Sequence, residues 1–595
     1  MNISNYIRAA SERKRILTLE LKKISKVNEI NENVMCIIDE LYTLDPKCNE
    51  TKQVLVNILL LCLDFNFLVK LLHFYPFNLD IVLLAGNTFK KMSNIGQALF
   101  YYRLASGLTD DLHIKSNVYY LISSLLFDSN QKHAAAIYAK MSLEENNTNS
   151  EAHNMLGVVY LQDGNIKESL VHFNLALNYC NEKNMKSNIH MNMGTALTTI
   201  CKFEESKEMY QLSLQYNESN YLAFQNKLLD ELYYETDEQI IFNNHLEINR
   251  YFNNVSVNTK KINKKRRIGI ISGDLSFHPV SNFIQPLINR PETFVFSNGM
   301  CDEGIAKREN VFMINSSSDI EVDALIRKCD IDILLDLSVH TFKNRVSALI
   351  NKPAPIIVNY LGYANSSGLK GIYDFRLVDH YSDGEGSLST EKLLFFKNSF
   401  LCFNPKKQLE VDVKRIGKAG KVFISVNRIQ KITNDVLRLW KRVLEETDGV
   451  IIIKNREIFC EENQERILSI LPRQKVIFKG FEQNITDSYK LFNEVDFALD
   501  TYPYSGTCST CDALAMGVPV ITLEGTSHRQ NVSKSILINS GMSHYVAKSE
   551  QEYINIAKCS VPNKMKIRNK FIKGYVCNES NWNSEFDELV KEMEL

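Results

Sequence analysis

A series of short apolar runs, many of them followed by a helical segment, constrains the fold of this chain more than any other feature. The first run, Ile268-Gly269-Ile270-Ile271-Ser272, has the continuous apolar character of a strand that is buried on both faces. Similar runs follow at residues 331–337, 356–361, 375–378, 422–426, 450–453, 475–478 and 497–499. Helical segments between strands predict βα units and parallel sheets. Because the pattern is too long for one doubly wound sheet, we expect two Rossmann-like lobes that divide near residues 405–418.

Before this region, roughly the first 240 residues have a helical pattern in which a unit recurs. Gly157 and Phe173 lie at offsets that Gly194 and Tyr210 repeat, and an earlier unit has Gly86 at the matching place. Small residues where two helices cross, with an aromatic residue between the helices, are typical of tetratricopeptide repeats. We therefore expect an α-helical repeat superhelix with a concave groove. Units before residue 80 are too irregular to assign.

The predicted domains follow from these two patterns. They are a repeat domain at 1–240, a linker at 241–265 that ends in a basic run, a first lobe at 266–405, and a second lobe at 406–595 that includes the C-terminal helices.

Composition excludes several classes of function. The formal net charge of -1 gives no overall field that would attract nucleic acid or an anionic membrane. The longest apolar stretch, Val54 to Phe74, is interrupted by polar residues and does not predict a membrane span. The N-terminus lacks the apolar core of a signal peptide, and the cysteines are scattered, as in a reducing compartment. We expect a cytoplasmic protein with no membrane span and no nucleic-acid partner.

Residues 494–533 combine the features of a phosphate site. The run 497–499 ends at Asp500, a loop rich in small and hydroxyl residues follows, and a helical segment begins near Asp512. Ligands of open α/β sheets lie outside the carboxyl ends of the strands, where a helix N-terminus offers N–H groups to a diphosphate. An ordinary strand–loop–helix connection is the alternative that these residues leave open.

Four sequence blocks carry a resemblance to a known family. In order, they are RRIGIISGDLSFHPVSNFIQPL, then DLSVHTFKNR with KPAPIIVNYLGYANSSG, then VNRIQKITNDVLRLWKRVL, and DTYPYSGTCSTCDALAMGVPVITLEG. From about Arg267 onward the chain resembles the family 41 glycosyltransferases, which include O-linked N-acetylglucosamine transferases and plant SPINDLY proteins. The resemblance implies a GT-B fold, with an acceptor-side first lobe and a second lobe that binds the nucleotide-sugar. The DTYPYSGT and KIT forms are more similar to SPINDLY and its bacterial relatives than to animal enzymes, whose insertion between the lobes is absent.

The resemblance also implies roles for individual residues. Lys431 matches the cation that neutralises the diphosphate as the glycosidic bond breaks. Asp512 matches the acid that holds the ribose hydroxyls, and its alternative is a helix-start aspartate stabilised by the helix dipole. Arg428 stands beside the diphosphate, where animal enzymes have Gln.

The expected phosphate loop departs in part from the animal pattern. Thr507, Cys508 and Ser509 align with a His-Thr-Thr sequence, so the His and the first Thr are replaced. Our candidates for donor binding remain the residues of this loop and their backbone N–H groups: Gly506, Thr507, Cys508 and Ser509.

Two histidines are candidate catalytic residues. His278 matches an active-site residue near acceptor and donor sugar, as a base or proton relay. His340 and Thr341 match a Gly-His-Thr motif in which Val339 replaces the glycine, and we expect catalysis from His340 and donor contact from Thr341. A further histidine proposed as base in animal enzymes is absent before the helix that starts near Asp319, so no base is assigned at that point.

No metal or other cofactor is expected besides the nucleotide-sugar. Asp330 and Asp332 have the DxD spacing of metal-dependent transferases, but they precede their strand and therefore lie at the wrong edge of the sheet. In the absence of a metal, Lys431 would supply the positive charge.

Taken with the resemblance, these features predict a metal-independent protein O-glycosyltransferase that transfers N-acetylglucosamine from UDP-GlcNAc to Ser or Thr. The alternatives are a SPINDLY-like O-fucosyltransferase that uses GDP-fucose, and a non-catalytic scaffold with a degenerate transferase domain. The expected partner is a protein acceptor along the repeat groove, with a homodimer through the repeats as a further possibility. We expect residues 265–595 to suffice for donor binding.

Overall fold

The computed structural model describes residues 65–252, 255–256, 262, 266–276, 279–405, 420–480 and 489–593, together with positions 13, 15, 16, 37 and 40. Contacts divide the chain into two compact units: residues 1–163 with 167–181, and residues 164–166 with 182–595. Most of the sequence before residue 65, most of the basic run and nearly all of the predicted lobe boundary lie outside the described residues. Among the described helices, none is both long and apolar enough to cross a membrane.

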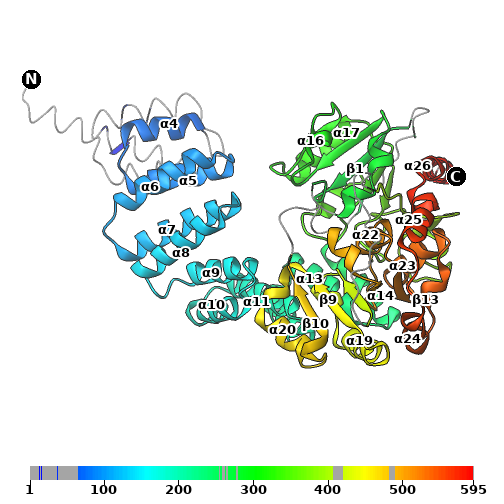
Figure 1. Cartoon of the computed structure of the whole chain (residues 1–595). Coiled ribbons are helices and arrows are strands. Elements are labelled where there is room, and N and C mark those ends of the chain that lie inside the picture. The colour runs from blue at the N-terminus through cyan, green and yellow to red at the C-terminus, as the bar shows by residue number, and fades with distance from the viewer. Residues whose placement is uncertain are drawn as a thin grey trace, which may run out of the picture. The chain divides into compact units, whose positions relative to one another are not determined.

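The described part of the first unit consists of helical hairpins, coloured blue to cyan in Figure 1. Its helices are α4 (Phe65–Phe74), α5 (Leu79–Lys91), α6 (Ile95–Gly107), α7 (Leu112–Asp128), α8 (Lys132–Glu145), α9 (Ser150–Gln162) and α10 (Ile166–Tyr179). A Cβ atom on Gly86 would lie 2.5 Å from the ring of Tyr102, and one on Gly157 would lie 2.5 Å from the ring of Phe173. Only glycine allows the paired helices to approach this closely. The predicted hairpin repeats are confirmed.

The second unit begins with the same kind of helices. They are α11 (Lys183–Thr199), α12 (Phe203–Tyr216), α13 (Tyr221–Tyr234) and α14 (Glu238–Leu246). Gly194 packs against Tyr210 as in the earlier hairpins, with a Cβ position 2.6 Å from the ring. These helices form one compact unit with the two lobes, so the contacts divide the chain well before the predicted boundary at residue 240.

Arg529 is one of the residues that join the last repeat helices to the second lobe. Its guanidinium donates to the carbonyl oxygens of Leu232 and Glu235, both at 2.8 Å, and pairs with Glu238 at 2.6 Å. The side chain is fully buried. The sequence alone could not reveal this contact, because nearly three hundred residues separate its partners.

The first lobe contains a seven-stranded parallel sheet in the order β3-β2-β1-β4-β5-β6-β7. Its strands are β1 (Ile268–Ser272), β2 (Thr293–Ser297), β3 (Val311–Met313), β4 (Ile333–Asp336), β5 (Ile356–Asn359), β6 (Phe375–Asp379) and β7 (Lys392–Phe396). Short helices lie along it: α15 (Gln285–Ile288), α16 (Glu303–Ala306), α17 (Asp319–Lys328) and α18 (Val346–Leu349). The strands predicted as apolar runs are present, whereas β2, β3 and β7 were not predicted.

The second lobe contains a six-stranded parallel sheet in the order β10-β9-β8-β11-β12-β13. Its strands are β8 (Val422–Ser425), β9 (Val450–Lys454), β10 (Val476–Lys479), β11 (Phe497–Leu499), β12 (Val520–Leu523) and β13 (Val546–Ala547). Its helices are α19 (Asn434–Thr447), α20 (Glu461–Leu468), α22 (Cys508–Ala515), α23 (His528–Asn539), α24 (Glu550–Lys558) and α25 (Lys564–Lys573). Two parallel sheets preceded by helical hairpins are the predicted fold class.

The last helix, α26 (Glu579–Glu592), returns to the first lobe, where it contacts β7 (Figure 1). The indole N–H of Trp582 donates to the carbonyl oxygen of Phe400 (3.0 Å), and its ring stacks on Phe396 at 5.4 Å. Thus the predicted assignment of all C-terminal helices to the second lobe does not describe α26.

Candidate functional site

Lys431 lies in the loop that follows β8, at the end of the short helix η3 (Ile429–Lys431). Its ammonium donates to the carbonyl oxygen of Ser505 at 2.7 Å and lies 3.8 Å from the centroid of the Tyr504 ring. Burial lowers the pKa of Lys431 to about 7; the Asp500 carboxylate opposes this shift and the Arg428 charge adds to it. A diphosphate next to this ammonium would restore the charged form.

The loop that accepts the hydrogen bond from Lys431 is held in place by a buried carboxylate just after β11. Asp500 accepts from the backbone N–H of Gly506 (2.8 Å) and from the hydroxyl of Thr522 (2.7 Å). A Cβ atom on Gly506 would lie 2.5 Å from the hydroxyl of Ser509, so the tight loop requires glycine. Burial raises the pKa of Asp500, and the donated hydrogen bonds oppose that shift. The sequence placed Asp500 at a strand end but did not predict this positioning role.

The helix α22 begins at Cys508, directly after this loop, with Thr507 at its N-cap position. The hydroxyl of Ser509 donates to the side-chain oxygen of Asn427 at 2.9 Å, which joins the helix to the loop that carries Lys431. The first N–H groups of a helix have no acceptor within it and favour anions. The predicted residues Gly506, Thr507, Cys508 and Ser509 therefore lie around a helix N-terminus beside a lysine.

Asp512 lies one turn inside α22 rather than at its start. Its carboxylate accepts from the Tyr489 hydroxyl at 2.8 Å and contacts the thiol of Cys508 at 3.5 Å. A residue in this position cannot cap the helix, so the alternative of a helix-start aspartate is wrong for Asp512. The role of Asp512 in ribose binding stays a prediction.

We expect Asp512→Ala to weaken binding of UDP or GDP by about 10-fold or more, because a hydrogen bond to a charged group contributes about 1.5–3 kcal/mol. Isothermal titration calorimetry measures the affinity directly. Asp435→Ala, an exposed aspartate on α19, serves as the control and should bind normally. If Asp512→Ala and the wild-type protein bind the nucleotide with equal affinity, Asp512 does not contribute to nucleotide binding.

Arg428 immediately precedes η3 and turns toward the repeat helices. It forms a hydrogen bond with the hydroxyl of Tyr233 on α13, and Tyr504 lies close enough to interact with its charge. The phenol groups of Tyr233 and Tyr504 raise the pKa of Arg428. Arg428 and Lys431 thus place two basic residues on one loop, and side chains of this kind form strong hydrogen bonds to phosphate groups.

His340 lies at the carboxyl end of β4, but it is buried and both of its ring nitrogens are bonded. Its Nε2 donates to the carbonyl oxygen of Ser367 (2.6 Å), and its Nδ1 accepts from the amide of Gln225 on α13 (3.3 Å). Burial lowers the pKa of His340 to about 4. A neutral imidazole with both nitrogens occupied is better suited to positioning the Gln225 side chain than to accepting a proton. Catalysis by His340 stays a prediction.

The turn around His340 fits the motif seen in the sequence. Thr341 donates its hydroxyl to the carbonyl oxygen of Ser338 at 2.9 Å, a local turn contact. Val339 has a φ of 50°, a conformation in which a β-branched residue is strained and glycine is not. This backbone explains why the related motif has glycine at that position.

His278 lies outside the described residues. The segment that follows it, η2 (Pro279–Asn282), is described, and the side-chain amide of Asn282 donates to the sulfur of Cys508 at 3.3 Å. The loop after β1 therefore ends at the start of α22, beside the predicted nucleotide site. Asp332, in contrast, accepts from the backbone N–H of Arg267 at the amino edge of the first sheet. This contact confirms that the DxD pair is remote from the carboxyl ends of the strands.

Three further residues of the site were not singled out from the sequence. Asn427 is the second residue after β8, and its position near a strand's carboxyl end was a usable signal. Tyr489 and Tyr233 reach the site from elsewhere in the chain, and no local pattern identifies them.

The fold has two lobes with one parallel sheet each, and comparison with known families identifies the class of two-lobed proteins to which it belongs. The Glycosyl transferase family 41 model matches residues 244–421 and 414–587, and the chain therefore belongs to that family.

Two plant relatives share at most about a third of their residues with this chain in the matched regions. The tomato (Solanum lycopersicum) protein named "Probable UDP-N-acetylglucosamine--peptide N-acetylglucosaminyltransferase SPINDLY" is 30% identical over 56% of this chain and 39% of its own length. The Arabidopsis thaliana protein named as a probable peptide N-acetylglucosaminyltransferase SEC is 23% identical over 51% of this chain and 34% of its own. The chain thus matches well under half the length of either relative. A solved O-GlcNAc transferase from Thermobaculum terrenum has a TM-score of 0.75 and 24% identity, covering 82% of this chain and 98% of that one, and this likeness concerns the fold.

Proposed function

We propose that this protein transfers N-acetylglucosamine from UDP-GlcNAc to Ser or Thr side chains of a protein acceptor, without a metal ion. The observation that carries the proposal is the position of Lys431, which is bonded to the loop that leads into α22. The ammonium would neutralise the leaving diphosphate. The diphosphate would also accept hydrogen bonds from the backbone N–H groups at the start of α22. Asp512 would hold the ribose, and Arg428 would contact the diphosphate or the base.

A second candidate is transfer of fucose from GDP-fucose. It is favoured by the higher identity to SPINDLY, at 30%, than to SEC, at 23%. The DTYPYSGT form of the loop supports the same relationship. Arg428, where animal enzymes have Gln, is consistent with a different preference for base or sugar.

One experiment separates these candidates. Thermal shifts of the full chain with UDP-GlcNAc, UDP-Glc, GDP-fucose, UDP and GDP rank the donors, since a ligand at 100 times its Kd stabilises by about 2.7 kcal/mol. Mass spectrometry of a protein acceptor then distinguishes an added N-acetylhexosamine from a deoxyhexose. Nucleotide binding without transfer from any of these donors would favour the non-catalytic scaffold.

The repeats would select the acceptor. We expect deletion of residues 1–147, which removes α4 to α8, to preserve donor binding and modification of a short Ser/Thr peptide. Modification of an intact protein acceptor should fall sharply, because the remaining repeats offer less of an extended binding surface. Initial rates with the two acceptors measure the difference.

A longer deletion is the control for this result. Removal of residues 1–240 also removes the backbone acceptors of Arg529, and we expect that protein to fold poorly. Residues 182–595, rather than 265–595, are therefore the smaller piece that we expect to bind the donor. If the protein without residues 1–147 modifies the intact acceptor at the full rate, its first repeats have another role.

A further inference from the structure

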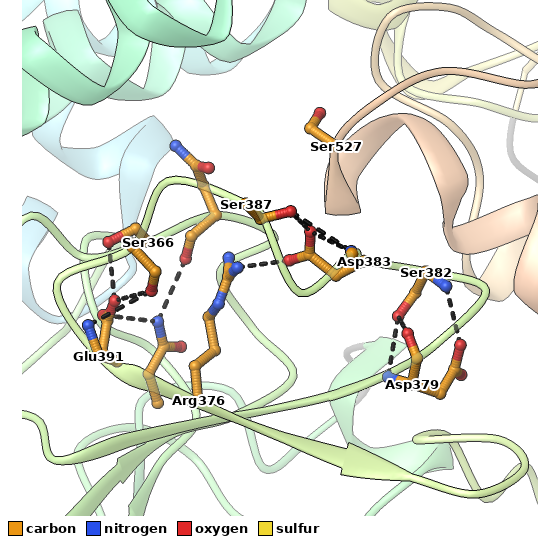
Figure 2. Close-up of polar contacts among 12 residues, drawn as sticks. Ser366, Arg376, Asp379, Ser382, Asp383, Ser387, Glu391 and Ser527 are labelled. Atoms are coloured by element: carbon orange, nitrogen blue, oxygen red, sulfur yellow. Dashed lines mark hydrogen bonds and ion pairs between the residues drawn. The ribbon is translucent and has the colours of Figure 1, made fainter.

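A cavity of about 330 Å³ lies where α14 meets both lobes. Figure 2 shows the polar residues on the side of the first lobe, with Ser527 opposite them. The walls of the cavity come from three segments of the chain. They include Glu238 and Phe242 from α14, Arg376 and Asp383 from β6 and the loop after it, and Ser527 and His528 at the start of α23. At this volume it lies near the lower end of the range for small-molecule pockets, about 300–1,000 Å³.

The cavity is distinct from the candidate donor site but adjacent to it. His528 lines the cavity, and the next residue, Arg529, accepts at its carbonyl oxygen from both the N–H and the hydroxyl of Ser505, each at 2.9 Å. Ser505 in turn is bonded to Lys431. Arg529 and Ser505 therefore separate the cavity from Lys431 at this point.

The cavity wall contains buried polar atoms without partners. Arg376, which is 4% exposed, donates through Nη2 to the Asp383 carboxylate, while its Nε and Nη1 have no hydrogen-bond partner among the described residues. Within that same part of the chain, His528 Nδ1 also lacks a partner. A buried polar group without a hydrogen-bond partner destabilises the folded chain, because it has lost its contacts with water and gained none in return. A cluster of them around one cavity indicates that a polar ligand or bound water completes the wall.

Charge then limits what the ligand can be. Arg376 is neutralised by Asp383, and Glu238 is paired with Arg529 at 2.6 Å. Burial lowers the pKa of His528 to about 4, so this histidine is neutral near pH 7. A further acid, Glu391, lies close enough to Arg376 to interact with its charge. The wall thus has no excess positive charge for a phosphate or a sulfate. A cation is disfavoured as well, because it could not accept from the Arg376 N–H groups that have no partner among the described residues. The ligand is therefore expected to be uncharged.

The hydrogen-bond donors and acceptors of the cavity wall indicate the chemical class of the ligand. Arg376 can only donate hydrogen bonds, whereas the ionised carboxylates of Asp383 and Glu238 can only accept them. Hydroxyl groups do both and suit a small cavity where the two kinds of group are neighbours. Phe242 and the partly exposed Leu388 add apolar surface, on which the C–H face of a sugar ring can pack. We propose that this cavity is a second carbohydrate site, which binds an uncharged mono- or disaccharide separately from the nucleotide-sugar donor.

Saturation-transfer NMR on the full chain tests the proposal, with N-acetylglucosamine, fucose and N,N′-diacetylchitobiose as probes and excess UDP or GDP present. Gly386 lines the cavity, and a Cβ atom there would have no atom within 4 Å, so Gly386→Phe should fill the cavity without disturbing the fold. The exposed neighbour Glu385 provides the matched control, Glu385→Phe. We expect a saccharide signal that persists with nucleotide, is lost in Gly386→Phe and is kept in Glu385→Phe.

Several results would overturn the second site. Loss of the saccharide signal on adding nucleotide would assign the sugar to the donor site. An equal signal in Gly386→Phe, or no signal with any of the probes, would also reject it. If only an uncharged Ser/Thr peptide gave a signal sensitive to Gly386→Phe, the cavity would be a peptide site. A failure of the nucleotides to bind would count against the proposed function alone, because the effect of Gly386→Phe can be measured without them.

Discussion

Lys431→Ala is expected to reduce sugar transfer by about 10²–10³-fold, the usual loss when one preorganised charge-stabilising group is removed. The reason is that the ammonium acts mainly on the diphosphate charge that develops as the glycosidic bond breaks. Initial rates with the preferred donor and a protein acceptor measure the effect. Lys441→Ala is the control, because Lys441 is an exposed lysine on the neighbouring helix α19.

The fold should survive this change, since Lys431 contributes one hydrogen bond and one ring contact to a loop that Asp500 also holds. A similar unfolding temperature for the wild-type protein and the variant would establish that the lost rate is chemical. Turnover close to that of the wild-type protein would show that Lys431 is not the charge-stabilising group.

The pKa of Lys431 gives this assignment a second readout. With a pKa of about 7 in the free protein, Lys431 loses its proton as the pH rises through neutrality. A bound diphosphate stabilises the protonated form, so binding should take up a proton and affinity should fall as the pH rises above about 7. A nucleotide-sugar is the right probe, because its diphosphate does not ionise in this range. In Lys431→Ala this pH dependence should disappear.

Arg529→Met is expected to destabilise the second unit by about 1–3 kcal/mol for each carbonyl oxygen that loses its donor, with a smaller contribution from Glu238, whose side chain is 24% exposed. The change leaves Glu238 without its cation and removes the donor to the carbonyl oxygens of Leu232 and Glu235. The midpoint of urea unfolding, followed by circular dichroism, reports the loss.

Lys534→Met provides the comparison on the same helix. Lys534 pairs with Glu524 at 2.6 Å, but both side chains are partly exposed. A partly solvated pair of this kind contributes about 0–1 kcal/mol. Equal midpoints for the two variants would contradict the role assigned to Arg529 as the link between the repeat helices and α23.

Local pattern in the sequence was enough to predict the elements whose environment is uniform. The helical hairpins are of this kind, because each of their glycines packs against an aromatic ring at the same sequence offset. The fully buried strands such as β1 and β8 are also of this kind, because apolar neighbours surround them on both faces. Strands with mixed or brief patterns were missed: β3 is only partly buried and β13 has two residues. The family match supplied Lys431 and Asp512, whose chemistry cannot be derived from periodicity.

Which of these elements meet was decided by the tertiary structure. A side chain's partners depend on how surfaces far apart in the chain pack, and neither residue type nor spacing encodes that arrangement. Arg529 therefore joins repeat helices to the second lobe, α26 returns to the first lobe, and His340 is buried with both nitrogens bonded. The cavity beside Arg376 likewise exists only where α14 and both lobes come together. The sequence by itself thus determined the repeat and sheet elements and the family, whereas the folded chain decided how the candidate site is assembled, because long-range packing sets burial, hydrogen-bond partners and charge.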